Sequence, residues 1–509
     1  MRSIFRSITL SFSLILLSCY ILSACRPQIS LHPTDPDPTP TSLAGPTRTL
    51  PATDLAGAHL EASPTVATEP PATPVPAQPG RTAYSLNVEL DYARHSTRVT
   101  ENVEFWNPSG DQITTLPFLV EPNRYPESFH LQSVAVDGQP EPEYQLSQNR
   151  LDLPLETPLA PAGKLSIHLV YQLDLPAIPP PSDTTRPVPY GYTKRQLNLV
   201  DWIPAVPPYR PGQGWLIHAP GYYGEHQVYE ATDLQIDLVI RNAPEGLLVA
   251  ASAPAQKNSD HYQYRLDSAR NFVLSASPVY KLSQKTVGGV TILDYYFPFN
   301  PGAGERVVND TADAVALYSR LFGPYPHETL SVVEADFLDG MEYDGLFFLS
   351  QGFYNLYDGT PKGYLTMIAA HETAHQWWYG LVGNDQALEP WLDEALATYT
   401  ERIFYEKTYP DLVDWWWGYR VKYYQPRGWI NLPVYDYGGF MPYRNAVYLR
   451  GALFLEEVRK RMGDEAFFAF LKDYATQEAY QLSSRQDFFR ILSMHTQVDL
   501  QDLVREYFK

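Results

Sequence analysis

Between residues 82 and 288, short runs of alternating apolar and polar residues follow one another along the chain, separated by Gly, Pro, Asn and Asp. A period of two places apolar side chains on one face of a half-buried strand. The pattern therefore predicts antiparallel strands that pack as a sandwich or saddle. Five runs carry it most clearly: YSLNVELDY, RVTENVEFWN, LQSVAVDG, LSIHLVYQLDLP and DLQIDLVI.

The pattern becomes helical beyond residue 288. Residues 306–322 have a helical apolar period that stops at Gly323-Pro324, where glycine caps a helix and proline cannot continue it. Residues 364–379 and the segment that starts at Pro390 are also predicted to be helices, and LSVVEADF a buried or edge strand. We expect an α+β protein with an N-terminal β domain over residues 82–288 and a mainly helical domain over residues 289–509.

The chain ahead of this β domain has a different composition. Two arginines precede an apolar run that ends in Leu22-Ser23-Ala24-Cys25, the layout of a secretory signal. This ending resembles the bacterial lipobox, in which the cysteine is lipidated. We expect residues 1–25 to be a lipoprotein signal peptide with Cys25 as the lipidation site, and the chain to be an exported bacterial lipoprotein on the outer side of the cell membrane. A plain signal peptide or an N-terminal membrane helix is the alternative.

Residues 26–81 hold 13 of the 46 prolines and show neither a helical nor a strand period. A segment of this kind cannot bury enough apolar surface to offset its ordering entropy. We expect a disordered linker that tethers the folded part to the lipid anchor.

Charge and cysteine content exclude several functions. The formal charge is −20, so phosphate backbones would be repelled, and a nucleic-acid partner is not expected. The only cysteines are Cys19 and Cys25. The part of the chain beyond them has no thiol for a disulfide, an iron-sulfur cluster or a nucleophile.

The segment HETAHQWWYGLVGNDQALEPWLDE contains a candidate metal site. In a helix, His371 and His375 are one turn apart on one face, so both imidazoles can bind one ion. Glu372 is rotated by about 100° from His371, which suits a base that activates water. Zinc needs a third protein ligand, and the chain between His375 and Glu394 is long enough to fold back and supply one.

An ordinary helix is the alternative interpretation of these five residues. Two observations weigh against it. Glu394 lies on a second predicted helix at a usable spacing, and the histidines are in an apolar, aromatic segment where unpaired polar groups would be costly.

The stretch HETAHQWWYGLVGND with WLDEALATYTE resembles the signature of gluzincins of the aminopeptidase N and leukotriene hydrolase type, an HExxH motif followed at a fixed spacing by a glutamate. The similarity continues in LFGPYPHETLSVVE, DGMEYDG and AVYLRGALFLEEVRKRMGDEAFFAFLKDY. Asp393 and Ala395 replace the usual Asn and Gly. The resemblance implies a thermolysin-like catalytic domain, one Zn²⁺ ion bound by His371, His375 and Glu394, and peptide substrates.

The resemblance also implies roles for residues outside the zinc helix. Tyr448, which precedes Arg450-Gly451-Ala452, corresponds to the tyrosine that stabilises the oxyanion. Gly340, Met341 and Glu342 correspond to the loop whose glutamate binds the substrate's α-amine. The function expected is removal of N-terminal residues from peptides.

Two alternatives stay open. The printed sequence continues from Tyr448 only to Lys509, whereas many relatives carry a further large helical domain over the cleft. We therefore expect an open site, which would also suit a zinc endopeptidase or a peptidase of long peptides. A non-catalytic surface-binding lipoprotein is the second alternative, although no ligand or base is missing. These motifs do not indicate the oligomeric state.

Overall fold

The computed structural model describes residues 80–180 and 189–509, all within one compact unit, Pro70–Lys509. The predicted signal peptide, the predicted lipidation site Cys25 and nearly all of the predicted linker lie outside the described residues. Among the helices of the described ranges, none combines the length and the apolar character that crossing a membrane requires.

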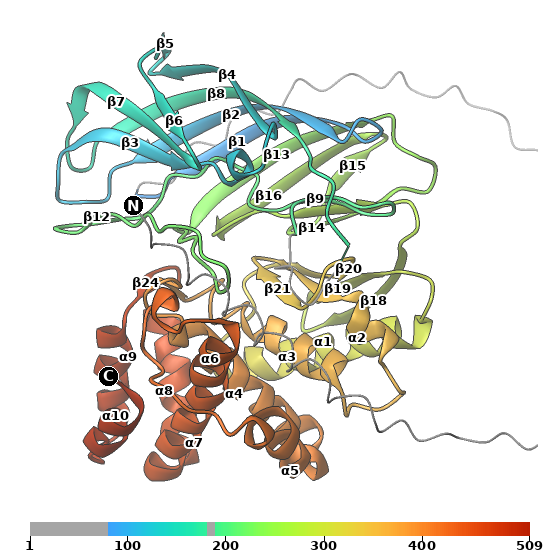
Figure 1. The fold of residues 1–509 in the computed structure, drawn as a ribbon, viewed down its shortest axis with the longest axis vertical. Helices are drawn as coiled ribbons and strands as arrows, with labels where there is room; N and C mark the ends of the chain where they lie inside the picture. The colour runs from blue at the N-terminus through green and yellow to red at the C-terminus, as the bar shows by residue number, and fades with distance from the viewer. Residues whose placement is uncertain (1–79, 181–188) are drawn as a thin grey trace, which may run out of the picture. The chain divides into compact units, whose positions relative to one another are not determined.

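An eight-stranded sheet forms the largest part of the N-terminal region (Figure 1). Its neighbouring strands are antiparallel except at one parallel pair, β1 with β13. Alternate residues of the long strands are buried, as the period of two predicts. In spatial order the strands are β15 (Gln256–Asn258), β16 (His261–Ala269), β13 (Thr232–Arg241), β1 (Ala83–Asp91), β2 (Ser96–Trp106), β8 (Lys164–Asp174), β4 (Phe129–Val136) and β5 (Gln139–Pro140).

Two smaller sheets complete the β core with it. One contains β3 (Ile113–Leu119), β7 (Arg150–Leu159) and β6 (Gln145–Ser147). The other contains β14 (Leu248–Ala251), β17 (Leu274–Ser277), β10 (Leu197–Leu199) and β9 (Gly191–Tyr192).

A five-stranded mixed sheet carries one wall of the candidate site. Its spatial order is β18 (Lys281–Val287), β19 (Val290–Tyr296), β20 (Thr329–Ala335), β22 (Leu346–Ser350) and β21 (Gly340–Tyr343). The strand with Glu342 is therefore an edge strand, antiparallel to β22. The sheet starts at Lys281, ahead of the predicted domain boundary at residue 288, and that boundary stays a prediction.

Most of the helices follow the strands along the chain, in agreement with the predicted α+β class (Figure 1). The helix predicted over residues 306–322 is longer at its start, because the Asn300 side chain accepts a hydrogen bond from the Ala303 N–H and caps it. The helices are α1 (Pro301–Phe322), α2 (Gln351–Asn355), α3 (Tyr364–Ala374), α4 (Trp391–Thr408), α5 (Val413–Trp416), α6 (Phe440–Arg444), α7 (Gly451–Met462), α8 (Asp464–Gln477), α9 (Arg485–His495) and α10 (Gln501–Tyr507).

The zinc-motif helix α3 packs between α1 and α4 and is buried along most of its length. It ends at Ala374, whereas the apolar pattern predicts an end at Tyr379. Beyond it the N–H groups of Gly380 and Leu381 donate to carbonyls five residues earlier, at 2.9 and 3.2 Å. Tyr379 has a φ of 147°. The sequence gives no sign of this change, because residues 375–379 are all buried and a helix here would bury the same side chains.

Candidate metal centre

Helices α3 and α4 bring three ligand atoms together. The Nε2 atoms of His371 and His375 are 3.0 Å apart. Glu394 Oε2 is 3.2 Å from the former and 3.5 Å from the latter. Each residue is at most 4% exposed. The helical spacing explains the two histidines, and the packing of α3 against α4 supplies the carboxylate.

These distances fit one zinc ion. With bonds of about 2.0–2.1 Å, neighbouring ligand atoms of a tetrahedral site are about 3.3 to 3.4 Å apart. Two imidazole nitrogens and one carboxylate oxygen are a donor set that zinc prefers. Although burial opposes ionisation, hydrogen bonds from His371 and His375 lower the pKa of Glu394 to about 2. The carboxylate is therefore ready to bind a cation.

Further hydrogen bonds orient both imidazole rings. His371 Nδ1 is 2.8 Å from Glu401 Oε1, and His375 Nδ1 is 3.0 Å from the Trp378 carbonyl oxygen. Glu401 also accepts two bonds from the Arg420 guanidinium, at 2.7 and 3.0 Å, and one from the Trp416 indole at 3.1 Å. Partners of this kind fix the tautomer of a ligating histidine and raise its basicity.

Glu372 extends from α3 toward strand β21. It is 4% exposed, and its Oε2 has no hydrogen-bond partner among the described residues. A Cβ atom on Gly340 would lie 2.1 Å from Glu372 Oε1. Gly340 thus leaves room for the candidate base Glu372. This explains why a glycine is needed at this position, which the predicted substrate-binding role does not. Met341 packs partly buried against the β core.

Glu342 lies in the same space as the zinc ligands. Its carboxylate forms one close group with Glu372 and His375 and another with Glu225 and Glu394, with ligand atoms within 4.8 Å in each group. Burial raises the pKa of Glu342 to about 8; His375 partly offsets this effect and Glu225 adds to it. Four carboxylates therefore surround one small space, and a second cation beside the metal would relieve their repulsion.

Tyr448 reaches the site from η6 (Asn445–Arg450), a π-helical segment between α6 and α7. Its hydroxyl donates to Glu394 Oε1, and its ring lies parallel to that of His371, with centroids 5.9 Å apart and an interplanar angle of 7°. Single π-helical turns occur often at functional sites because they redirect side chains locally. The hydroxyl is a neutral donor beside the candidate metal.

The structure thus brings together every residue predicted from the zinc motif, as well as Tyr448 and Glu342. Sequence reasoning missed Glu225, Glu401 and Arg420. Glu401 is two turns after Glu394 on the same helix, so helical spacing could have identified it. Glu225 comes from a loop of the β region far away in sequence, and no local pattern marks it.

The site combines a histidine in the last turn of α3, a second histidine at the C-cap of that helix and a glutamate from α4, beside an edge strand of a mixed sheet. This is the arrangement that the resemblance to gluzincins predicts. Residues 308–427 match the family described as the Peptidase family M1 domain. This match agrees with the predicted resemblance to gluzincins of the aminopeptidase N type, in which a single zinc ion is catalytic.

Curated relatives match over part of the chain. Endoplasmic reticulum aminopeptidase 1 of Mus musculus is 24% identical over 276 residues, which cover 51% of this chain and 29% of that protein. Endoplasmic reticulum aminopeptidase 2 of Homo sapiens is 30% identical over 141 residues, 26% of this chain and 15% of that protein. The chain therefore spans less than a third of the length of these relatives.

Solved structures share the fold over most of the chain. The M1 zinc metallopeptidase from Deinococcus radiodurans has a TM-score of 0.60 and 17% identity, covering 85% of this chain and 95% of that one. A mutant of that enzyme bound to a Tyr-Ser-Ala substrate gives a TM-score of 0.61 at 16% identity, covering 84% and 94% of the two chains. The predicted order of a β-rich region followed by a mainly helical one is confirmed.

Replacing Glu394 by Ala should remove zinc from the purified chain, because two histidines alone rarely form a tight site. Replacing Glu372 by Gln should leave one zinc ion per chain, since Glu372 lies beside the ligands rather than among them. Elemental analysis after dialysis measures both. Equal zinc loss in the two variants would contradict this division between ligand and base.

Proposed function

We propose that this chain is a zinc-dependent aminopeptidase that removes N-terminal residues from peptides. One observation carries the proposal: the Glu342 carboxylate, on an edge strand, is grouped within 4.8 Å both with Glu372 and His375 and with Glu394 and Glu225. Its Oε1 has no hydrogen-bond partner among the residues described. The aminopeptidase relatives and the peptide-bound structural neighbour support the choice of substrate.

A protonated α-amine is the substrate group that this charge distribution favours. The Glu342 and Glu225 carboxylates are held close together, and Glu342 is 6% exposed. An ammonium group between them would gain charge-assisted hydrogen bonds and reduce their mutual repulsion. Because the same carboxylates adjoin the metal ligands, binding the amine would place the first peptide bond beside the metal and set the register of cleavage.

The remaining groups suit hydrolysis of that bond. When bound, zinc supplies a Lewis acid beside the peptide carbonyl. Glu372 is buried with an unpaired carboxylate oxygen, and burial together with Glu342 raises its pKa well above the usual value. A carboxylate of raised pKa is suited to take a proton from the attacking water and later to deliver one to the departing amine. The Tyr448 hydroxyl is placed to donate to the oxyanion.

The two alternatives find less support. An internal peptide segment would place a neutral amide beside the Glu342 and Glu225 carboxylates, and a neutral amide would not reduce their mutual repulsion as an ammonium group does. A non-catalytic binding protein would not need a base or an oxyanion donor. Glu372 and Tyr448 both adjoin the zinc ligands in this chain.

Changing Tyr448 to Phe should lower turnover by ~10² to 10³ with little change in KM, because it removes one oxyanion donor and keeps the ring. Zinc content should not change. Steady-state kinetics on a free dipeptide or tripeptide measure the effect. Tyr443 to Phe is the matched control, because its ring adjoins that of Tyr448, with centroids 5.7 Å apart. A larger loss in the control than in Tyr448→Phe would transfer the role to Tyr443.

Acetylating the N-terminus of a peptide substrate should lower kcat/KM by more than an order of magnitude, because one charge-assisted hydrogen bond is worth roughly 1.5 to 3 kcal/mol. Glu342→Ala should cause much of the same loss on free peptides and little further loss on acetylated ones. Mass spectrometry of the products would locate the cleaved bonds. Internal cleavage of acetylated peptides at the rates of free ones would reject the aminopeptidase and leave the zinc chemistry intact.

We also propose that the mature chain is exported and anchored to the outer side of a cell membrane by lipid on Cys25. The lipobox-like Leu22-Ser23-Ala24-Cys25 sequence supports this proposal. A single acyl chain anchors a protein only marginally, so more than one chain is required. Intact-mass analysis of the wild-type protein should find the acyl groups, and Cys25→Ser should lack them. A wild-type protein without an acyl adduct would refute the anchor.

A further inference from the structure

Arg270 is a buried arginine of the β region that contacts the backbone just beyond the zinc-motif helix. It lies between β16 and β17 and is 3% exposed. Its guanidinium donates to carbonyl oxygens from three separate segments of the chain. The acceptors are Tyr379 (2.6 Å), Gly380 (3.1 Å), Leu381 (3.4 Å), Gln481 (3.0 Å) and Tyr229 (2.8 Å).

The segment that Arg270 binds has an unfavourable backbone conformation. Tyr379 has a φ of 147°, a region that residues with side chains rarely adopt, and such strain persists only where the surroundings enforce it. The packing around the guanidinium is close. A Cβ atom on Gly383 would lie 2.3 Å from Arg270 Cζ. Arg270 therefore restrains the turn through the three successive carbonyls of residues 379–381 and through direct packing.

This turn also orients a zinc ligand. The carbonyl of Trp378, directly before Tyr379, accepts the hydrogen bond of His375 Nδ1 at 3.0 Å. The opposite ring nitrogen, Nε2, faces Glu394 and His371. A shift of the turn would therefore rotate the imidazole that binds the metal.

The same loop of the β region holds the strand with Glu342. The Arg270 backbone N–H donates to Asp344 Oδ2 at 2.7 Å, and the Asp344 N–H donates to Asn271 Oδ1 at 3.1 Å. Asp344 is two residues beyond Glu342. Asn271 also donates to the Tyr379 hydroxyl. Two consecutive residues thus connect the end of strand β21 to the turn after the zinc helix.

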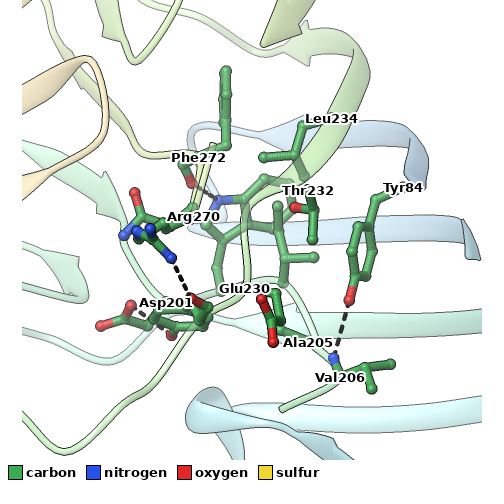
Figure 2. Close-up of a pocket in the computed structure, with 13 residues that line it drawn as sticks. Tyr84, Asp201, Ala205, Val206, Glu230, Thr232, Leu234, Arg270 and Phe272 are labelled. Atoms are coloured by element: carbon green, nitrogen blue, oxygen red, sulfur yellow. Dashed lines mark hydrogen bonds between the residues drawn. The ribbon is translucent and has the colours of Figure 1, made fainter. Parts of the chain in front are cut away.

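If Arg270 served only to pack the interior, its side chain would not need to be charged. Arg270 borders a cavity of about 30 Å³, with Glu230 and Asp201 also on its wall (Figure 2). Burying a charge costs free energy that an apolar side chain of similar volume would avoid. The guanidinium instead offers several donors in one plane, which is what successive backbone carbonyls require.

We propose that Arg270 is a positioning residue of the zinc site, which fixes His375 relative to Glu342 by holding the Tyr379 turn and Asp344. The inference rests on the proposed zinc site but not on the choice of peptide substrate. A role in overall stability alone would produce a different result in the following experiment.

The experiment measures zinc release from the full chain to a chromophoric chelator, together with thermal unfolding. Arg270→Ala should release zinc about tenfold faster than the wild type, because removing a group that supports a metal ligand typically lowers metal affinity by about this factor. Guanidinium ion at millimolar concentration should restore slow release, because it can occupy the vacated space. The matched control is Arg459→Ala on α7, since Arg459 is 6% exposed and pairs with Glu406 and Asp464, away from the zinc helix.

The control separates positioning from stability. Arg459→Ala should lower the unfolding temperature and leave zinc release within about twofold of the wild type, well below the tenfold effect expected at Arg270. Equal release rates in the two variants, or no rescue by guanidinium, would overturn the role of Arg270. If Arg270→Ala fails to fold, Arg270→Lys takes its place without the guanidinium test, because the lysine side chain fills the space. It should also release zinc faster than Arg459→Ala, since lysine lacks the planar set of donors, and equal release in these two variants would overturn the role of Arg270. A wild-type chain that takes up no zinc would overturn the metal site itself.

Discussion

The interaction on which the rest of the site depends is the close approach of three buried ligand atoms. The Nε2 atoms of His371 and His375 and Oε2 of Glu394 lie between 3.0 and 3.5 Å apart. Lone pairs at these distances repel unless a cation or shared protons lie between them. The protein must therefore hold each ligand from behind. Glu401 holds the first imidazole and the Trp378 carbonyl the second, while the Tyr448 hydroxyl binds the other oxygen of Glu394.

The support behind the ligands is itself charged and buried. Glu401 is fully buried, and although burial disfavours its charge, Arg420 and His371 keep its pKa below the usual value. Arg420 comes from η3 (Trp417–Val421), and Tyr448 from η6, and both segments are π-helical. A wider turn moves a side chain relative to its neighbours without ending the helix. The two irregular turns thus place one charge and one hydroxyl that a regular helix would direct elsewhere.

Local patterns predicted much of this architecture. Alternation indicated the long β strands, and helical spacing placed His371 and His375 on one face. Glu394 was predicted from its spacing after the HExxH motif. Glu342 was predicted from the resemblance of the Gly340-Met341-Glu342 sequence to a known substrate-binding loop. Glu225 and Arg270 could not be predicted, because each acts through contacts with segments far away in the sequence. The end of α3 was misplaced for a related reason: the turn at Tyr379 is stabilised by Arg270 from the β region rather than by a signal in its own sequence.

The β region therefore forms part of the candidate site, and its contribution bears on whether the proposed peptidase would act as an exopeptidase or an endopeptidase. It supplies Glu225 to the carboxylate group around Glu342 and Arg270 to the turn behind His375. Leaving a buried charged group without a partner costs several kcal/mol, whereas pairing it with a charged amine offsets that cost. A free N-terminus meets this requirement and an internal amide does not. Whatever the length of the peptide, the repulsion within this group of carboxylates would favour binding by the end that carries the positive charge, as the proposed function requires.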